Sequence, residues 1–228
     1  MSKIEYRVEN KYVVSDSDLI ILENRLKNIM DVDMHQDGDF YQIKTLYFDD
    51  IFNSCLESND SGVDYRKKYR IRTYGTDRKV INFEIKEKRN GFTKKSVCPL
   101  TEDEYNKILN GDIILSDDRK PINELFLQMR FNIMEPKIII GYERTAFVYN
   151  SGNVRITIDR NIKVSRECSS FLDEKTSGFV SVMPAGNHIL EVKYDEFLPD
   201  IIAKQLEIKK LRQTAFSKYY LGRSFVNF

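Results

Sequence analysis

Long cationic side chains occur at every second position of the segment KYRIRTY, at Lys68, Arg70 and Arg72. In a β-strand successive side chains point to opposite faces, so these three cations would share one face. Lys218, near the C-terminus, is a further cation. The same alternation places other polar residues on one strand face each: Arg7, Glu9 and Lys11; Glu84, Lys86 and Lys88; Tyr142 and Arg144; Arg155, Thr157 and Asp159; Glu191 and Lys193.

Two interpretations fit these charged faces. An antiparallel sheet commonly keeps one face in water, which explains the charges without any ligand. If the sheet instead closes with its apolar face outward under helices, the charged face becomes a lumen that binds anions. Cations about 6 Å apart repel by roughly 3 kcal/mol per pair at an effective dielectric constant near 20, so such a lumen requires carboxylates, water or an anionic ligand.

The few acids on these faces limit the kinds of ligand that the faces could bind. Glu9 and Glu191 would be either internal counter-ions or metal ligands. A polyanion that needs both many cations and a divalent ion is most simply a chain of phosphates, because hard metals prefer oxygen ligands and share them with phosphate. Asp159 and Lys193 are candidates for the lumen or for a salt bridge between neighbouring strands. Asp49 is predicted to fix a strand end rather than to hold a metal.

Strands must position these side chains, and alternating apolar and polar residues predict about eight of them. The predicted strands are Ile4–Val14, Tyr41–Asp49, Tyr65–Tyr74, Val80–Lys88, Thr93–Cys98, Lys137–Tyr149, Val154–Val164 and His188–Tyr194. This pattern predicts an α+β fold that is mainly antiparallel β. Eight strands is a number at which a closed barrel becomes possible.

A few helices are expected around the sheet. One follows a cap at Ser15 or Asp16, one opens with a capping box between Thr101 and Glu104, and one runs from Pro121 to about Met134. A last helical stretch starts near Pro199, and 165–187 is predicted to be a loop. No linker divides the chain, so a single domain over residues 1–228 is expected.

Composition limits the class of protein. The chain has 228 residues, and its 36 Lys+Arg and 35 Asp+Glu give a net charge of +1, which argues against a general nucleic-acid coat. The three cysteines lie far apart, as expected for reduced thiols in a cytoplasmic protein. No stretch is apolar enough to predict a membrane span.

Taken in order, eight segments of the chain resemble the VTC domain, a branch of the triphosphate tunnel metalloenzymes, also called the CYTH-like superfamily. The segments are RVENKY (7–12), LYFDD (46–50), KYRIRTY (68–74), FEIK (83–86), YERTAF (142–147), VRITID (154–159), LEVKY (190–194) and FSKYY (216–220).

The resemblance implies an eight-stranded, closed antiparallel tunnel barrel with a charged lumen and peripheral helices. It also implies a polyphosphate polymerase, which moves the terminal phosphate of ATP onto a polyphosphate chain with Mn²⁺ or Mg²⁺. By motif, Glu191 would hold the metal, with Glu9 as a second candidate. The implied phosphate ligands are Lys11, Arg70, Arg72, Lys86, Arg144, Arg155 and Lys218, assisted by Tyr142, Ser217 and either Lys94 or Lys95. Lys68 is left outside this set because the family motif does not require it.

Other activities of the same fold remain open. Metal-dependent relatives often begin with an ExExK pattern, whereas Arg7 fills its first position here and leaves Glu9 before Lys11. The alternatives are hydrolysis of inorganic triphosphate or polyphosphate, and a non-catalytic module that binds polyphosphate. Eukaryotic relatives carry membrane spans, so coupling to transport would require a membrane-protein partner.

Overall fold

The computed structural model describes residues 7–34, 36, 38–75, 80–90, 92–113, 115–208 and 211–226. Antiparallel strands are the largest class of secondary structure in the described chain and are accompanied by helices, which confirms the predicted α+β class. The strands are β1 (Val8–Ser15), β2 (Asp31–Val32), β3 (Tyr41–Asp49), β4 (Arg66–Tyr74), β5 (Ile81–Arg89), β6 (Phe92–Leu100), β7 (Glu135–Tyr149), β8 (Val154–Ser165), β9 (Val180–Ser181) and β10 (Asn187–Tyr194). The helices are α1 (Asp16–Leu26), α2 (Ser54–Asp60), α3 (Glu102–Asn110), α4 (Lys120–Phe131), α5 (Asp200–Leu206) and α6 (Lys218–Val226), with short 3₁₀ turns at Ser151–Asn153 and Cys168–Ser170.

All eight predicted strands are present. The first is described from Val8 onward, and the predicted part before Arg7 lies outside the described residues. The two unpredicted strands, β2 and β9, have two residues each and are too short to show alternation. The described strands follow the path β1-β10-β8-β7-β3-β4-β5-β6, with β2 beside β7 and β9 beside β8. This path has two ends, so the predicted closure into a barrel is not confirmed.

The helix predictions are confirmed where a cap marks the start. Ser15 and Asp18 form a capping box at α1, and Thr101 and Glu104 form one at α3. Helix α4 carries its proline in the first turn, as predicted. The stretch after Pro199 is two helices, α5 and α6, rather than one, and α2 was not predicted. In the part of the chain that the structure describes, no helix has the length and hydropathy needed to cross a membrane.

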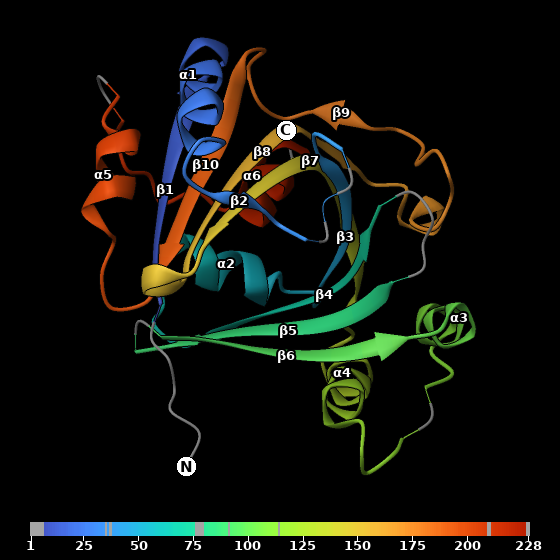
Figure 1. Ribbon diagram of the computed structural model, residues 1–228. Helices are drawn as coiled ribbons and strands as arrows, with labels where there is room; N and C mark the ends of the chain where they lie inside the picture. Colours follow the sequence, from blue (N-terminus) through green and yellow to red (C-terminus); the bar gives the residue numbers. More distant parts are fainter. Residues whose placement is uncertain are drawn as a thin grey trace. The chain divides into compact units, whose positions relative to one another are not determined.

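Contacts divide the chain into two compact units, and the expectation of a single domain stays a prediction. The first unit comprises residues 1–42, 142–162 and 183–217. In it, β1 pairs with β10 and β10 pairs with β8, and α1 lies along the strands beside α5 (Figure 1). Its core consists of alternate strand residues such as Val14, Ile156 and Leu190, packed against Leu22 and Leu26 of α1. The other face of these strands carries the predicted polar residues.

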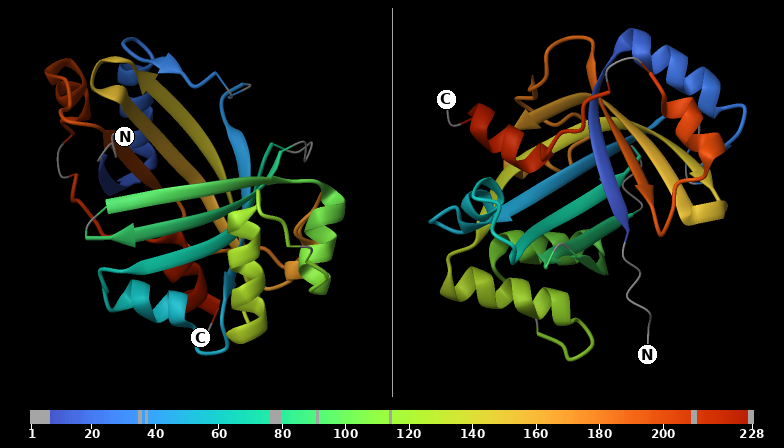
Figure 2. Two further views of the ribbon diagram at one scale, coloured as in Figure 1. Left: turned by 90° about the horizontal axis from the view of Figure 1, so that it is seen from below. Right: turned by 90° about the vertical axis from the view of Figure 1, so that its left-hand side faces the viewer.

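The second unit comprises residues 43–141, 163–182 and 218–228. In it, β3, β4, β5 and β6 are neighbours in that order, and helices α3 and α4 pack on the outer strands β5 and β6 (Figure 2). The apolar face of these strands is buried at Ile71, Phe83 and Ile85, together with Leu125 of α4. The cations of KYRIRTY therefore lie on the face opposite this core.

Candidate functional site

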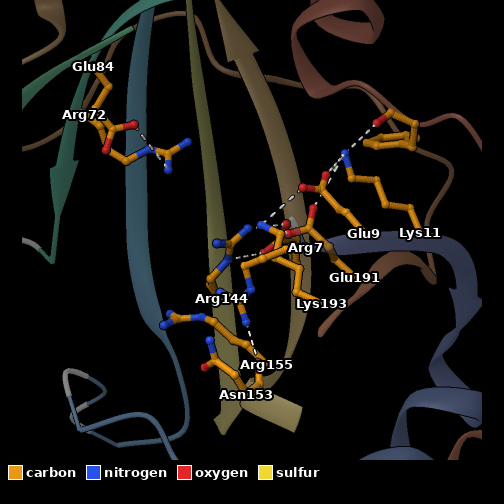
Figure 3. A network of polar contacts seen from close by, with 12 residues as sticks. Arg7, Glu9, Lys11, Arg72, Glu84, Arg144, Asn153, Arg155, Glu191 and Lys193 are labelled. Carbon is orange, nitrogen blue, oxygen red and sulfur yellow. Dashed lines mark hydrogen bonds and ion pairs between the residues drawn. The ribbon is translucent and has the colours of Figure 1, made fainter. Parts of the chain in front are cut away.

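Strands β1 and β10 bring two acids and two lysines together in the first unit. In the antiparallel register Glu9 lies opposite Lys193 and Lys11 opposite Glu191. The Lys11 Nζ lies 2.8 Å from Glu9 Oε1 and 3.6 Å from Glu191 Oε2. The Lys193 Nζ lies 2.5 Å from Glu191 Oε1 and 3.5 Å from Glu9 Oε2. Both predicted metal-binding carboxylates thus lie between the same two ammonium groups (Figure 3).

Lys11 is held in its charged form. Burial alone would lower the pKa of its ammonium, but Glu191 and Glu9 outweigh that effect and the pKa is raised. Lys11 also donates to the backbone oxygen of Phe216 at 3.1 Å. A side chain fixed in this way carries a full positive charge at neutral pH and can bind an anion as a point charge.

Glu9 and Glu191 are the residues that could hold a divalent metal. Mg²⁺ is commonly bound by one or two carboxylates together with substrate phosphates, rather than by a cage of protein ligands alone. Two carboxylates that reach the same lysines fit that requirement. Among the described residues no group of three or more His, Cys, Asp or Glu side chains gathers. A metal at Glu9 and Glu191 would therefore need further oxygen ligands from a bound phosphate.

Arg144 on β7 makes a forked ion pair with Asp159 on β8. Its Nε lies 2.6 Å from Asp159 Oδ1 and its Nη2 lies 2.8 Å from Oδ2, and Asp159 is fully buried. Burial alone would lower the pKa of Arg144, but Asp159 outweighs it and the pKa is raised. The guanidinium also lies over the ring of Tyr142, 5.3 Å from its centroid. Asp159 is thus engaged in the salt bridge between neighbouring strands that the sequence left as one of two possibilities.

Arg155 on β8 has partners that the sequence did not indicate. Its Nη1 lies 2.6 Å from the buried Asp33 Oδ2, and its Nη2 donates to the Tyr41 hydroxyl at 3.3 Å. In the register Arg155 lies opposite Lys193, so it extends the charged face of β1 and β10 onto β8. The first unit therefore holds the predicted ligands that lie on β1, β7, β8 and β10, namely Glu9, Lys11, Tyr142, Arg144, Arg155 and Glu191.

A single buried carboxylate, Glu84 on β5, is surrounded by cations in the second unit. Its Oε2 lies 2.7 Å from Arg70 Nε and 2.5 Å from Arg70 Nη2, and 3.9 Å from Arg72 Nη1. Its Oε1 lies 3.3 Å from Lys95 Nζ. Burial alone would raise the pKa of Glu84, but the three cations outweigh it and lower the pKa from 4.5 to about 2. Glu84 is therefore ionised throughout the physiological pH range.

Two residues of β3 orient the arginines and were not predicted. Arg70 donates to the Tyr47 hydroxyl at 3.3 Å, and Arg72 donates from Nε to Thr45 Oγ1 at 3.1 Å. Burial would raise the pKa of Tyr47, but Arg70, Arg72 and Lys68 lower it to about 7. The alternation along β3 could have indicated these two residues, because Thr45 and Tyr47 are polar and lie two positions apart on one face of the strand.

The strand register resolves which lysine of TKKSV lies on the charged face. Lys95 lies opposite Lys86, whereas Lys94 lies opposite Glu87 on the other face. The β4, β5 and β6 residues that share the face of Glu84 include the cations Arg66, Lys68, Arg70, Arg72, Lys86, Lys88 and Lys95. Glu84 is the single carboxylate on this face of the three strands. The surplus of positive charge is therefore local, although the net charge of the chain is only +1.

The remaining predicted ligands, Ser217 and Lys218, lie where helix α6 begins. The helix is anchored by the buried Asp49, which accepts a hydrogen bond from the Tyr219 hydroxyl and lies 3.6 Å from Arg223 Nη1. Asp49 also accepts from backbone N–H groups at the start of α2, so its predicted role at a strand end is confirmed. Asp49 thus connects the end of β3 to the helix that carries Lys218.

Comparisons with known proteins give the family and the fold of the chain. The model of one protein family, the VTC domain, matches residues 6–227. Among curated proteins, none matches the chain significantly.

Solved structures with a similar fold include a protein of Bacillus halodurans provisionally named an adenylate cyclase. It is 15% identical with a TM-score of 0.51, and the match covers 89% of this chain and 87% of that one. A protein of Pyrococcus horikoshii OT3 is 14% identical with a TM-score of 0.50, covering 98% of this chain and 100% of that one. A conserved hypothetical protein of Pyrococcus furiosus is 14% identical with a TM-score of 0.51, covering 94% and 98%. At these identities the three structures establish a shared fold.

Proposed function

The chain belongs to the VTC domain family, and from that premise we propose that it is a polyphosphate polymerase. The proposed reaction transfers the terminal phosphate of ATP onto a polyphosphate chain and depends on Mn²⁺ or Mg²⁺. We further propose that the strands close into the tunnel barrel of the family, with the charged faces lining it. Family membership supports phosphoryl transfer in general, and the polymerase reaction is the finer part of the proposal.

The observation that carries the proposal is the unequal charge on the inner face of β4, β5 and β6. One carboxylate, Glu84, is shared by Arg70, Arg72 and Lys95, while further lysines lie on the same face. Ion pairs on a solvent-exposed face contribute little to stability. Glu84 is instead buried, and the cations around it lower its pKa to about 2. A bound phosphate chain would bring further negative charge to a face on which Glu84 is the one carboxylate of the three strands.

In the proposed reaction the chain's own residues hold and orient phosphates. The guanidinium groups of Arg70, Arg72 and Arg144 would donate to phosphate oxygens from the N–H groups that Glu84, Thr45 and Asp159 do not take, whereas Lys11, Lys86 and Lys218 act as point charges. ATP would be aligned so that a terminal oxygen of the polyphosphate attacks its γ-phosphorus in line, while the bond between the γ-phosphorus and the β–γ bridging oxygen breaks and ADP leaves. No covalent nucleophile is required, because positioning and charge neutralisation supply most of the catalysis in phosphoryl transfer.

Glu191, with Glu9 beside it, would hold the divalent metal. When bound, the metal supplies positive charge to the phosphate oxygens of the transferred group. The two carboxylates also keep Lys11 charged and form ion pairs with Lys193. Glu191 therefore has a metal-dependent role and a structural one, which can be separated experimentally.

The test is a product assay with ATP and MnCl₂. The purified chain is incubated with both, and the products are resolved by gel electrophoresis with a stain for polyphosphate, alongside a measurement of free phosphate. We expect long polyphosphate. Release of free phosphate alone would indicate the hydrolase, and binding of polyphosphate without turnover for any metal would indicate the binding module.

Glu191→Gln is the informative variant. We expect it to lose metal-dependent turnover while keeping metal-free binding of tripolyphosphate, because the Lys and Arg ligands remain. Glu196→Gln, an exposed carboxylate two residues beyond β10, is the matched control and should retain turnover. Unchanged turnover in Glu191→Gln would rule out its proposed role.

A further inference from the structure

Three lysines form a row across neighbouring strands of the second unit. Lys68 on β4 lies opposite Lys86 on β5, and Lys86 lies opposite Lys95 on β6. Directly opposite residues on one face have Cβ atoms about 4.5–5.5 Å apart, and like charges at that separation destabilise the sheet. Three like charges therefore stand in one row, although Lys95 also lies 3.3 Å from Glu84 Oε1.

The opposite face of the same strands shows the ordinary arrangement. There the neighbouring row is Lys67, Glu87 and Lys94, in which the acid stands between the two lysines. The Lys67 Nζ lies 3.8 Å from Glu87 Oε2 and 2.9 Å from Glu124 Oε1 on α4. The row of like charges is thus a property of one face, and it is the face that carries Arg70 and Arg72.

Lys68 lies next to the helix that carries the predicted ligand Lys218. Its Nζ donates to Asn59 Oδ1 on α2 at 2.5 Å and lies 5.8 Å from the centroid of the Tyr219 ring on α6. An amide oxygen and an aromatic face orient an ammonium without removing its charge. Lys68 is therefore held in place while it remains a cation.

The spacing along β4 defines successive positions for an extended anion. Arg72, Arg70 and Lys68 occur at every second residue, about 7 Å apart along an antiparallel strand. The span from Arg72 to Lys68 is then about 14 Å, which is longer than a triphosphate. A ligand that follows this backbone spacing from Arg72 past Arg70 to Lys68 would be a longer chain of phosphates.

We propose that Lys68, with Lys86 and Lys95 of its row, forms an additional subsite that binds phosphates beyond the third in a polyphosphate chain. This inference rests on the proposed function, because it assigns the row to the same polyanion. It makes Lys68 a determinant of chain length, although the family motif does not include it. A tripolyphosphate held at Arg70 and Arg72 would not depend on Lys68.

The test compares two ligands without metal, so that neither is turned over. Dissociation constants of inorganic tripolyphosphate and of long-chain polyphosphate are measured by calorimetry at low salt for the wild-type chain, Lys68→Met and Lys94→Met. Methionine keeps an unbranched stem without the charge. Lys94→Met removes the same charge from the opposite face and is the matched control. Lys68→Arg, which restores a cation, is the rescue variant.

We expect Lys68→Met to weaken long-chain binding about five- to tenfold, as for loss of one charged contact, and tripolyphosphate binding less than twofold. The slope of log affinity against log salt for the long chain should fall by roughly 0.7–0.9, as expected for one lost phosphate contact. Lys68→Arg should recover the affinity, and Lys94→Met should leave both ligands unchanged. Thermal unfolding without ligand confirms that each variant is folded, and Lys68→Gln replaces Lys68→Met if that variant is not.

Two other results overturn the inference in distinguishable ways. Suppose that the wild-type chain binds both ligands, and that Lys68→Met lowers the affinity for both equally or leaves both unchanged. The additional subsite is then refuted while the proposed function stands. If the wild-type chain binds neither ligand, the proposed function and the subsite fail together.

Discussion

Replacing Glu84 by glutamine removes the one carboxylate that Arg70, Arg72 and Lys95 share. The pKa of Glu84 is lowered from 4.5 to about 2, and this difference corresponds to about 3 kcal/mol of folding stability at neutral pH. Only 1% of the side chain is exposed, so solvent screens the interaction little. We therefore expect Glu84→Gln to lower the free energy of unfolding by about 3 kcal/mol at pH 7, a large part of a typical domain stability of about 5–15 kcal/mol.

The pH dependence of this difference follows from the sign of the shift. A carboxylate whose pKa is lowered in the folded state stabilises the fold fully above its unfolded pKa of about 4.5. That stabilisation is lost as the pH falls toward 2. The difference between the wild-type chain and Glu84→Gln should therefore shrink to about 1 kcal/mol at pH 3.

The assay is urea unfolding at pH 7 and at pH 3, with Glu87→Gln as the control. Glu87 lies on the same strand but on the other face, at 3.8 Å from Lys67 Nζ, and its loss should change stability by less than about 1 kcal/mol. Tripolyphosphate at low salt should stabilise Glu84→Gln more than the wild-type chain, because the cations have lost their internal anion. Equal stability of Glu84→Gln and Glu87→Gln at pH 7 would refute the reasoning.

Three further substitutions test other parts of the site. Tyr47→Phe should abolish a phenol that titrates near pH 7, seen by phenolate absorbance. Because the Tyr47 pKa is lowered, the wild-type chain should gain stability over this variant as the pH rises from 7 to 9, and a flat difference would contradict the assignment. Arg144→Lys should break the forked pair with buried Asp159 and lower the free energy of unfolding by about 2–4 kcal/mol in a urea titration; an unchanged midpoint would argue against that pair. Lys95→Met should weaken long-chain polyphosphate binding about fivefold while Lys94→Met should not, and the reverse order in calorimetry would show that the β5–β6 register is wrong.

The long strands could be predicted from the sequence because each has two different faces. In β4, for example, Ile71 is buried on one face while Arg70 and Arg72 point to the opposite face, and only the two-residue period of a strand places all three in this way. The register was not predictable from parity alone. It decides that Lys95 rather than Lys94 joins Lys86, and it follows from the pairing of Arg89 with Phe92 across the β5–β6 hairpin.

Helices α2 and α6 could not be predicted as separate helices because residues other than a local N-cap hold their ends. Helix α2 follows Asn53 in a left-handed conformation with φ 58°, and its first N–H groups donate to the side chains of Asp49 and Asp50 rather than to that of the N-cap residue Asn53. Helix α6 is fixed by Tyr219 on Asp49, which is 170 residues away in the sequence. The contacts of Glu84 with three cations also depend on tertiary structure. The alternation of the sequence places these side chains on one face of each strand, but it does not identify which of them are partners.

The central claim is that the charged strand faces bind a chain of phosphates rather than water. Thermal unfolding of the wild-type chain with increasing inorganic tripolyphosphate, at low salt and without metal, tests this most directly. Because a ligand that binds only the folded state stabilises it by an amount that grows with the logarithm of the ligand concentration above Kd, the melting temperature should rise steadily with tripolyphosphate, and added salt should reverse the rise. A melting temperature that does not change with tripolyphosphate would mean that the charged faces are solvated surfaces, and it would contradict the account.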